Sequence, residues 1–399
     1  MIGPRDVESA VERLEGVARA TPVTTSGTIS RLAGRPVLFK PEHLQRTGSF
    51  KIRGAYNRIA GLAPGTRVVA ASAGNHAQGV ALAARLTGRA ATIFMPANAA
   101  LPKVEATRAY GAEVRLEGEG VDDCIDLARG FGEDGGHVYV PPFDDPDVMA
   151  GQATVGWEMA REAPEAAVAV VPVGGGGLLG GTAAALAHWA PGMRVVGVEA
   201  EGAASMRAAL DAGRPVRLDG VATIADGIAV REVSWLTLAH VRAYVDDLVT
   251  VSDEEISRAM LLLLERAKWL VEPAGAAALA AVLAGRVPEG RGPVVVVLSG
   301  GNVDPLLLTR LVEHGLAAAG RYLQLRVLLR DHPGALAALA AALADLGLNV
   351  LDVIHHRSGG PTVAPDEVEV LVTVETRDPG HRDQTVADLR DRGFRVEQN

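Results

Sequence analysis

Short apolar runs of strand character alternate with alanine-rich stretches of helical character between about residues 37 and 300. This alternation is typical of parallel β-α-β winding, in which each strand is buried on both faces. The clearest predicted strands are 68–71, 91–95, 168–171, 195–198 and 294–298. Several of them run into glycine-rich turns at their carboxyl ends, where open α/β sheets bind ligands. We therefore expect an α/β domain with its site at that edge.

After Gly315 the predicted strands and helices follow a different order. Its predicted elements are a strand at 321–329, a turn at 331–334, a helix at 335–346, a strand at 349–355, a hairpin at 358–361, a strand at 367–375, a helix at 384–392 and a strand at 395–396. The order is βαββαβ, which is a ferredoxin-like unit. Because 399 residues exceed what one core serves, we expect a separate small domain from about residue 321.

Charge and cysteine content narrow the class of protein. A net charge of −9 argues against nucleic-acid binding, which needs a basic face. No uncharged apolar run reaches the ~18 residues of a membrane helix, and the charged start of the chain does not resemble a signal peptide. Cys124 is the only cysteine, which excludes an internal disulfide and fits a reducing compartment. We expect a cytoplasmic protein with neither nucleic-acid nor membrane partners.

Lys51 is one of four lysines, against thirty-five arginines, and lies in the stretch from Thr47 to Ala55. Ser49 is predicted to cap a helix, which puts Lys51 in the first turn, where the helix dipole disfavours a cation and lowers the amine pKa. Only a neutral amine attacks an aldehyde to form a Schiff base. The alternative is an ordinary exposed lysine on a helix.

The segment Ser72–Gly79 follows a buried strand and opens a helix, so free backbone N–H groups converge at its start. We expect an anion there, and a substrate carboxylate is one candidate, with Asn75 and His76 as side-chain donors. The alternative is a plain strand-turn-helix with capping side chains. The predicted substrate-binding residues are Ser72, Ala73, Gly74, Asn75 and His76.

Four consecutive glycines, Gly174–Gly177, also join a strand to a helix. A backbone of this kind wraps closely around a phosphate. A dinucleotide site competes with this interpretation, because Gly175, Gly177 and Gly180 fit G-x-G-x-x-G and Glu199 ends the next strand. On this segment alone the nicotinamide interpretation is the stronger. A third interpretation gives the glycines only a role in helix packing.

Polar groups stand at two further element ends. Ser299 follows a buried strand, where its hydroxyl could hydrogen-bond a ring nitrogen without bringing a charge, or could form an ST-turn. Glu272 precedes a helix that begins with Pro273, where a carboxylate favours the dipole. The histidines show no metal-binding spacing, and His355 and His356 face opposite sides of a strand. We expect no transition metal.

Five motifs, G-S-F-K-I-R-G-A, S-A-G-N-H-A-Q-G, G-G-G-G-L, E-P-A-G-A and S-G-G-N, resemble in order and spacing the threonine ammonia-lyases of the fold-type II pyridoxal-phosphate enzymes. The resemblance spans about residues 1–315. It implies a catalytic domain over 1–320 that binds pyridoxal 5′-phosphate and has two parallel-sheet α/β subdomains, with the smaller one inserted at about 48–150.

The resemblance also assigns roles to residues. It makes Lys51 the Schiff-base lysine, places Phe50 near the cofactor ring, makes Asn75 a donor to the 3′ oxygen, and pairs Ser299 with the ring nitrogen. The glycine turn becomes the phosphate site. The implied cofactor-binding residues are Phe50, Lys51, Asn75, Gly174, Gly175, Gly176, Gly177, Leu178 and Ser299.

The βαββαβ tail over 321–399, with D-H-P-G at its first turn, resembles an ACT domain, a regulatory module that senses amino acids such as isoleucine or valine. An allosteric amino-acid effector is therefore expected at the turn 331–334, with Asn349 nearby. Because βαββαβ units commonly pair sheet to sheet, the chain is expected to form a homo-oligomer, either a dimer or a tetramer. The implied regulatory residues are Asp331, Pro333, Gly334 and Asn349.

The chain departs from the related serine racemases and lyases at three places. Racemases have a second catalytic serine where this chain has Ala73, so two-face proton exchange is not expected. Their divalent-cation site resembles Glu199, Ala203 and a later acid, but Ser205 stands here, which leaves a monovalent cation as the alternative to no metal. Arg231–Ser234 replaces the glycine- and proline-containing continuation common in the lyases, and this leaves the substrate less defined.

The expected reaction is the dehydration and deamination of L-threonine to 2-oxobutanoate and ammonia, as in isoleucine biosynthesis, with Lys51 as general base. L-Serine and 3-hydroxyaspartate are alternative substrates because they share the β-hydroxyl. Two other functions remain open. One is an NAD-dependent amino-acid dehydrogenase that uses the G-x-G-x-x-G glycines and Glu199. The other is a non-catalytic amino-acid sensor built on 321–399.

Overall fold

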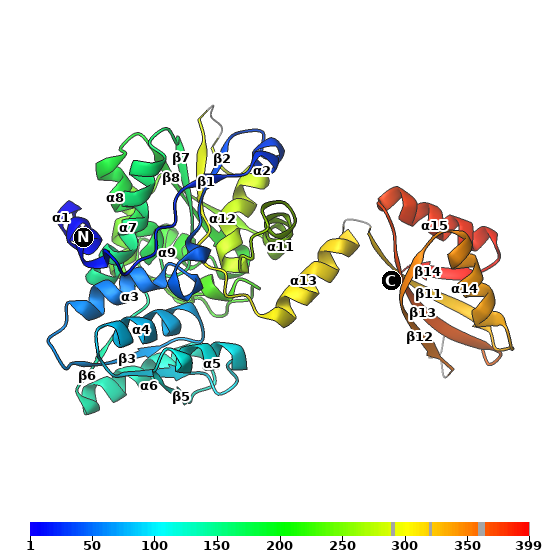
Figure 1. Cartoon of the computed structure of the whole chain (residues 1–399), viewed down its shortest axis with the longest axis horizontal. Coiled ribbons are helices and arrows are strands. Elements are labelled where there is room, and N and C mark those ends of the chain that lie inside the picture. Colours follow the sequence, from blue (N-terminus) through cyan, green and yellow to red (C-terminus); the bar gives the residue numbers. More distant parts are fainter. Residues whose placement is uncertain (289–291, 319–320, 358–363, 399) are drawn as a thin grey trace. The chain divides into compact units, whose positions relative to one another are not determined.

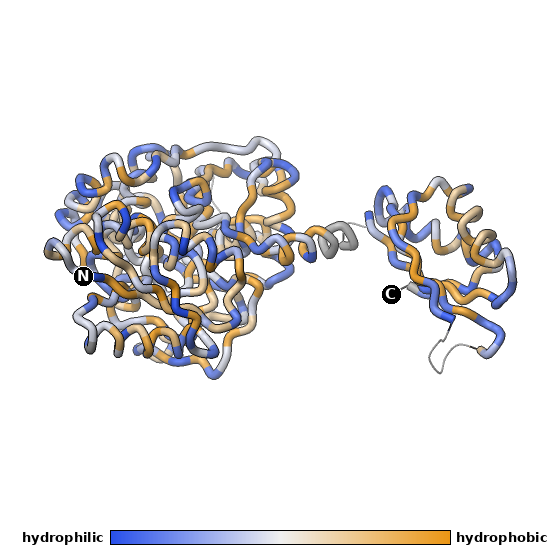
Figure 2. The backbone as a smooth tube through the Cα atoms, turned by 60° about the horizontal axis from the view of Figure 1, so that its bottom comes forward, coloured by the Kyte–Doolittle hydropathy of each residue, from blue (hydrophilic) through white to orange (hydrophobic). Residues whose placement is uncertain are grey.

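The computed structural model describes residues 1–288, 292–318, 321–357 and 364–398. The chain forms two compact units, Met1–Asp304 and Pro305–Asn399, and each has a hydrophobic core of its own. Figure 1 labels most of the helices and strands of both units, and Figure 2 shows apolar residues running through each unit. No helix in the described part of the chain is long and apolar enough to cross a membrane.

The first unit contains a six-stranded sheet whose strands are parallel apart from the short first one. In spatial order its strands are β1 (Thr24–Thr25), β2 (Val37–Lys40), β10 (Val294–Val297), β7 (Val168–Pro172), β8 (Arg194–Ala200) and β9 (Asp247–Val251). The strand β10 consists of four buried valines, because a parallel strand covered on both faces carries apolar side chains in both directions.

Helices surround this sheet. They are α1 (Pro4–Leu14), α2 (Gly27–Leu32), α7 (Pro146–Glu162), α8 (Gly177–Trp189), α9 (Ser205–Ala212), α10 (Trp235–Tyr244), α11 (Asp253–Leu262) and α12 (Pro273–Leu283). The short helical turns are η1 (Glu42–Leu44), η2 (Arg46–Gly48), η3 (Glu201–Ala203), η4 (Asp226–Ile228) and η5 (Leu263–Ala267). A Cβ at Gly156 of α7 would lie 2.6 Å from the Thr182 carbonyl of α8, so glycine allows these two helices to pack closely.

A second, four-stranded parallel sheet of the same unit is built from residues 67–139. In spatial order its strands are β5 (Glu113–Leu116), β4 (Ala91–Met95), β3 (Arg67–Ala71) and β6 (His137–Tyr139). The associated helices are α3 (Lys51–Ala60), α4 (Asn75–Leu86), α5 (Leu101–Ala109) and α6 (Val121–Gly135). Helix α3 packs against both α4 and α7, and thus lies at the junction of the two subdomains.

The structure confirms the predicted α/β class with two parallel-sheet subdomains. All five strands predicted from apolar runs are present, with bounds that differ by at most two residues. Their carboxyl ends lead into the turns that carry the predicted site residues, because a parallel sheet collects those ends at one edge.

The second unit contains the predicted ferredoxin-like fold. Its elements are α13 (Pro305–Ala318), β11 (Tyr322–Arg330), α14 (Ala335–Asp345), β12 (Asn349–His356), β13 (Glu367–Glu375), α15 (Pro379–Asp391) and β14 (Arg395–Gln398). The antiparallel sheet has the order β12-β13-β11-β14, which confirms βαββαβ. The prediction that its second helix begins at residue 384 is wrong, because Asp378 caps it and Pro379 occupies its first turn. The predicted hairpin at 358–361 lies outside the described residues.

Candidate active site

Lys51 is the first residue of α3, as the sequence predicts, but Ser49 does not cap this helix. The cap position is Phe50, without a side-chain cap, and Ser49 instead forms an antiparallel bridge with Gly300. The Phe50 N–H donates to the Ser299 carbonyl at 3.2 Å. Pairing with a distant segment therefore overrides the local capping pattern, and it joins the Lys51 helix to the turn after β10.

The Lys51 amine is poised to lose its proton. Its Nζ donates to the Pro142 carbonyl at 3.3 Å and lies 5.1 Å from the centre of the Phe50 ring. Burial lowers the pKa of the amine to about 8, against the opposing charge of Glu272. The direction agrees with the prediction from the sequence, and the cause in the structure is desolvation of the amine, although the residue as a whole is half-buried.

The glycine turn leaves no room for side chains. A Cβ at Gly175 would lie 2.1 Å from the Phe143 ring, and one at Gly177 would lie 2.5 Å from Oε1 of Gln152. Gly176 has a φ of 88° and stands directly before α8. Because the first amides of a helix have no intrahelical partner, the turn presents bare backbone donors that suit an anion.

The segment after β6 links Lys51 to this glycine turn. The Pro142 carbonyl accepts hydrogen bonds from Nζ of Lys51 and, at 3.1 Å, from Nε2 of Gln152. Phe143 packs on Gly175, and the Gln152 side chain contacts Gly177. The sequence interpretation missed this segment, although it follows a strand of a parallel sheet, and the same strand-end rule could have found it.

Phe50 and Leu178 belong to one hydrophobic cluster, which also contains Val173 at the end of β7. The starts of α3 and α8 therefore share one hydrophobic cluster. The structure thus gathers the predicted cofactor-binding residues Phe50, Lys51 and Ser299, and Pro142 and Gln152 connect them to the glycine turn.

The turn before α4 places Asn75 in a hydrogen-bond chain. Its Nδ2 donates to Oε1 of Glu272 at 2.6 Å, and its Oδ1 accepts from Nδ2 of Asn302 at 2.7 Å. Ser72 Oγ accepts from the Gly74 N–H at 3.1 Å, so its hydroxyl shapes the same turn. The three side chains Asn75, Glu272 and Asn302 come from three separate segments.

Glu272 is buried, with 4% of the residue exposed. Burial raises the pKa of its carboxyl to about 7, the charge of Asp226 adds to the increase, and the hydrogen bond from Asn75 opposes it. The sequence offered only a favourable helix dipole for this residue. The geometry makes it a direct partner of the site.

His76 does not offer a free donor. Its Nε2 lies 2.8 Å from the Val140 carbonyl, which can only accept, so Nε2 carries the proton and donates it there. Burial, followed by the charge of Lys51, lowers the pKa of the ring to about 3, and the imidazole is neutral. Its buried Nδ1, without a hydrogen-bond partner, is then an acceptor. The donor that the sequence assigned to His76 is thus occupied within the protein.

Glu199 lies near the end of β8, Ala203 in η3 and Ser205 at the start of α9, and the Glu199 carboxylate serves the fold. Its two carboxylate oxygens accept from the backbone N–H groups of Met206, at 2.7 Å, and Arg207, at 3.0 Å, in the first turn of α9. Burial raises the pKa of this carboxyl to about 7. The described residues contain no group of three His, Cys, Asp or Glu side chains that could hold a metal ion.

The predicted regulatory residues do not form one cluster in a single chain. The turn with Asp331, Pro333 and Gly334 follows the end of β11, whereas Asn349 begins β12 and pairs with Glu375 at the opposite end of the sheet. The expectation that Asn349 lies near this turn is therefore wrong within one chain. A crossover connection returns the chain to the end where the first strand began.

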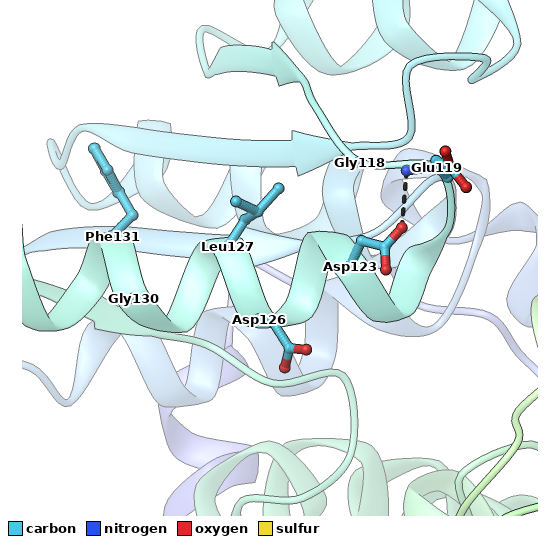
Figure 3. A pocket seen from close by; sticks show the side chains of 7 residues that line it. All are labelled: Gly118, Glu119, Asp123, Asp126, Leu127, Gly130 and Phe131. Carbon is cyan, nitrogen blue, oxygen red and sulfur yellow. Dashed lines mark hydrogen bonds between the residues drawn. The ribbon is translucent and has the colours of Figure 1, made fainter.

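A surface hollow of about 650 Å³ lies beside α6 (Figure 3) and contains no predicted site residue. Its lining residues are Gly118, Glu119, Asp123, Asp126, Leu127, Gly130 and Phe131. The Asp123 carboxylate accepts from the N–H groups of Glu119 and Gly120, so it caps the helix. The hollow is separate from the site at the sheet edge.

Comparisons with known proteins agree with this geometry. The model of the family described as pyridoxal-phosphate dependent enzyme matches residues 14–300, and that of the ACT domain matches 323–394. An L-threonine ammonia-lyase of Thermotoga maritima is 44% identical over 99% of both chains. One of Geobacter sulfurreducens is 45% identical over 98% of both. The crystal structure of a threonine deaminase from T.th. has a TM-score of 0.72 and 40% identity, covering 76% of this chain and 99% of its own.

Proposed function

This chain belongs to the pyridoxal-phosphate dependent enzyme family, and we propose that it converts L-threonine to 2-oxobutanoate and ammonia. The observation that carries this proposal is the Lys51 amine, with its lowered pKa, joined through Pro142 to the segment that packs on the glycine turn. The similarity to two L-threonine ammonia-lyases over nearly the whole chain supports the choice of reaction.

The residues present fit pyridoxal phosphate on structural grounds. The Gly174–Gly177 turn and the amide of Leu178 offer backbone donors for a phosphate, and no side chain could fit there. Lys51 offers an amine for the aldehyde, Phe50 an apolar neighbour for the ring, and Ser299 an uncharged hydroxyl at the sheet edge. When bound, the cofactor supplies a ring that stabilises negative charge at the substrate Cα.

The chain's own groups then perform binding and proton transfer. Lys51 accepts the Cα proton as general base, since with a pKa of about 8 roughly a tenth of the amine is neutral at pH 7. The amides of Ser72 and Gly74 are taken by the Phe94 carbonyl and by Ser72 Oγ, so the amides of Ala73, Asn75 and His76 at the start of α4 bind the substrate carboxylate. Neutral His76 fixes this turn by donating to Val140 and brings no charge to the carboxylate.

The test compares two lysine-to-arginine changes in the purified holoenzyme. Lys51→Arg keeps a cation but removes a neutral amine, so we expect kcat for ammonia release from L-threonine to fall about 100-fold to 10,000-fold. Lys268→Arg is the control, because Lys268 is exposed and bonds only a nearby carbonyl, that of Glu265. Full turnover by Lys51→Arg would overturn the proposal.

The substrate preference is tested by kinetics. L-Serine and 3-hydroxyaspartate share the β-hydroxyl, so kcat/KM for the three amino acids has to be measured side by side with the same holoenzyme. We expect L-threonine to have the highest value. A higher value for either of the others would reassign the substrate and leave the β-elimination reaction in place.

We further propose the functional division of the chain. Residues 1–320 form the catalytic part, with the smaller subdomain at about 48–150, and 321–399 form the regulatory part. The separate core of the second unit and the ACT match support this. We place the enzyme in the cytoplasm and in isoleucine biosynthesis. The single buried Cys124, with its Sγ donating to the Glu117 carbonyl, is consistent with that compartment.

For regulation, we propose that an amino acid such as isoleucine or valine binds between two copies of the second unit. Strand β12 is an edge strand, and all its residues are exposed. Antiparallel pairing of two β12 strands about the point between Val353 and Ile354 brings Asn349 of one copy toward Arg357 of the other. Arg357 contacts Asp331 at 3.5 Å, so this pairing reunites the predicted regulatory residues.

A further inference from the structure

Asn302 connects two segments of the active site and has no role in the reaction described above. It follows the turn after β10, and its Nδ2 lies 2.6 Å from the Thr47 carbonyl and 2.7 Å from Oδ1 of Asn75. An amide nitrogen carries two N–H groups, so one side chain can satisfy both acceptors. Asn302 therefore ties the stretch before Lys51 to the turn before α4.

The stretch before Lys51 is strained and needs such support. Thr47 has a φ of 63° and ψ of 11°, in the left-handed region that a β-branched residue rarely adopts, and Gly48 follows with a φ of 71°. The Thr47 carbonyl accepts from Asn302, and the Gly48 carbonyl accepts from the Gly301 N–H at 2.9 Å. Successive carbonyls of the strained turn are thus bound by Gly301 and Asn302, three residues before α3 begins.

The orientations of the Asn302 and Asn75 side-chain amides both follow from the Thr47 carbonyl, at one end of this series of hydrogen bonds. The Thr47 carbonyl can only accept, so Nδ2 of Asn302 faces it. The same nitrogen contacts Asn75, whose facing atom must then be the acceptor Oδ1. As a result Nδ2 of Asn75 points to Glu272 and presents an N–H, rather than a lone pair, to the site.

Glycines enclose the three side chains. A Cβ at Gly48 would lie 2.4 Å from Oδ1 of Asn302, and one at Gly300 would lie 2.0 Å from Oε1 of Glu272 and 3.0 Å from Nδ2 of Asn75. Because no larger residue fits at either place, the backbone closes over the hydrogen-bond chain. This enclosure limits the rotamers open to Asn302 and Asn75.

We propose that Asn302 is a positioning residue of this enzyme. It holds the strained turn that leads into Lys51, and it orients Asn75 so that a donor faces the cofactor oxygen. The role rests on the proposed function insofar as it assumes pyridoxal phosphate in the site. Asn302 acts through Lys51 and Asn75 and touches neither substrate nor cofactor.

The first test is Asn302→Asp in the full-length protein. The carboxylate has nearly the same shape but only accepts, so it repels the Thr47 carbonyl and Oδ1 of Asn75. Titration of the cofactor-free protein with pyridoxal phosphate is expected to show an affinity lowered about tenfold or more, with a matching loss in kcat. Asn302→Ala removes the donor without adding charge and serves as a second variant if the aspartate variant does not fold.

Asn57→Asp is the matched control. Asn57 is buried on the same helix as Lys51, donates to the Asp147 carbonyl at 2.7 Å and accepts from Arg13 at 2.7 Å. We expect this variant to lose thermal stability but to bind pyridoxal phosphate within about twofold of the wild type. Equal losses of cofactor affinity in Asn57→Asp and Asn302→Asp would mean that Asn302 is only structural, and the proposal would fail.

A rescue experiment tests the orientation of the side-chain amides in this series of hydrogen bonds. In Asn302→Asp the Asn75 amide has to turn, so its Oδ1 faces the Glu272 carboxylate oxygen that accepts the Asn75 N–H in the wild type. A second change, Glu272→Gln, supplies a donor to the turned amide. We expect it to raise the cofactor affinity of Asn302→Asp several-fold, and not to raise that of the wild type. The same effect in both backgrounds contradicts the proposal.

Separate outcomes would disprove the proposed reaction and the proposed role of Asn302. A wild-type protein that binds pyridoxal phosphate but releases no ammonia from L-threonine removes the proposed reaction and leaves the Asn302 test intact. An Asn302→Asp variant that binds the cofactor as tightly as the wild type removes the positioning role and leaves the reaction intact. A wild-type protein that binds no pyridoxal phosphate overturns both.

Discussion

Burial sets the reactivity of Lys51, which has a measurable consequence. In cofactor-free protein, the rate of pyridoxal phosphate capture should rise about tenfold per pH unit below the amine pKa and level off above about pH 8, because only the free base reacts. Stopped-flow absorbance across pH 6 to 10 measures this. A free lysine derivative, with a pKa of about 10.4, is the control and should show no plateau in that range.

Glu272 shifts this profile in a defined direction. Its charge raises the pKa of Lys51, against the larger effect of burial, so Glu272→Gln should move the plateau to lower pH. A profile that moves to higher pH would contradict this effect of the Glu272 charge, and a wild-type profile without a plateau would show that burial does not lower the pKa of the amine.

Single residues were predictable from the sequence where their neighbours are local. Lys51 and Ser299 stand next to helix starts and strand ends that the pattern of residues reveals. Ser49 was misjudged because its partner is Gly300, and the donor of His76 is taken by Val140. Both partners lie far along the chain, so no local capping or turn rule could identify them.

At the scale of elements, a buried group of charges joins α3 to its neighbours. Arg53 is fully buried and bonds Glu42 of η1 at 2.8 Å and Glu158 of α7 at 2.6 Å. Lys40 at the end of β2 bonds Glu158 at 2.6 Å and Glu162 at 3.1 Å. The helix that begins at Lys51 is thereby anchored to the larger subdomain.

Removing Arg53 should destabilise this junction strongly. Arg53→Met leaves the buried Glu42 carboxylate without its ion-pair partner and removes one of the two cations paired with Glu158, which costs about 3–5 kcal/mol in the free energy of unfolding. Urea unfolding of the cofactor-free protein measures the loss. Arg58→Met on the same helix is the control, because Arg58 is partly exposed and its pairs with Asp145 and Asp147 should contribute about 1 kcal/mol or less. Equal losses in the two variants would contradict the expectation that the buried ion pairs contribute more to stability than the exposed ones.

A low pH should reproduce part of this loss in the free energy of unfolding. Burial alone would raise the pKa of Glu42, but the charge and hydrogen bonds of Arg53 outweigh it, and the pKa is lowered. The stabilisation is therefore complete above the unfolded pKa of about 4.3 and is lost as pH falls through the folded value.

Arg231 belongs to the segment in which the sequence departs from the related lyases, and in the structure it is part of a group of ion pairs. Arg231 and Arg217, in the segment between α9 and α10, both contact Asp122 of α6, at 3.4 Å and 2.5 Å. Lys103 of α5 contacts Asp226 of η4 at 2.6 Å in the same segment. These ion pairs link the segment between α9 and α10 to the smaller subdomain.

Cutting the link should weaken substrate binding modestly. Asp122→Asn removes the shared carboxylate, and because the pairs are exposed we expect KM for L-threonine to rise only about two- to fivefold. The wild-type KM should rise with salt through the screening of the same pairs, whereas the variant KM should respond less. Arg258→Ala, which breaks an exposed pair within α11, is the control. A variant with wild-type KM and salt response would contradict this role of the segment.

At the scale of the molecule, the sequence predicted two units because the order of strands and helices changes after Gly315. Each unit has a hydrophobic core of its own. It could not reveal which residues meet at the effector site. The turn at Asp331 and the start of β12 at Asn349 look close along the chain, yet the crossover through α14 puts them at opposite ends of the sheet. The proposed pairing of two β12 strands would bring them together.

The exposed edge strand makes that pairing testable. Val350, Leu351, Val353 and Ile354 of β12 are 39–49% exposed, and antiparallel self-pairing sets Asp352 of one copy opposite His355 of the other. An unpaired apolar edge of this kind is a template for another strand. Placing charges on it should prevent the pairing, because two like charges would then meet across the interface.

The double variant Val353→Lys with Ile354→Lys should therefore show a smaller mass by light scattering than the wild type. It should keep its basal turnover of L-threonine and lose its response to isoleucine and valine, since the proposed effector site spans two copies. Leu336→Lys is the control, because Leu336 is 41% exposed on α14 and not on the edge strand. If the double variant keeps its wild-type mass and its effector response, β12 is not the interface, and Asn349 and Asp331 must act at separate places.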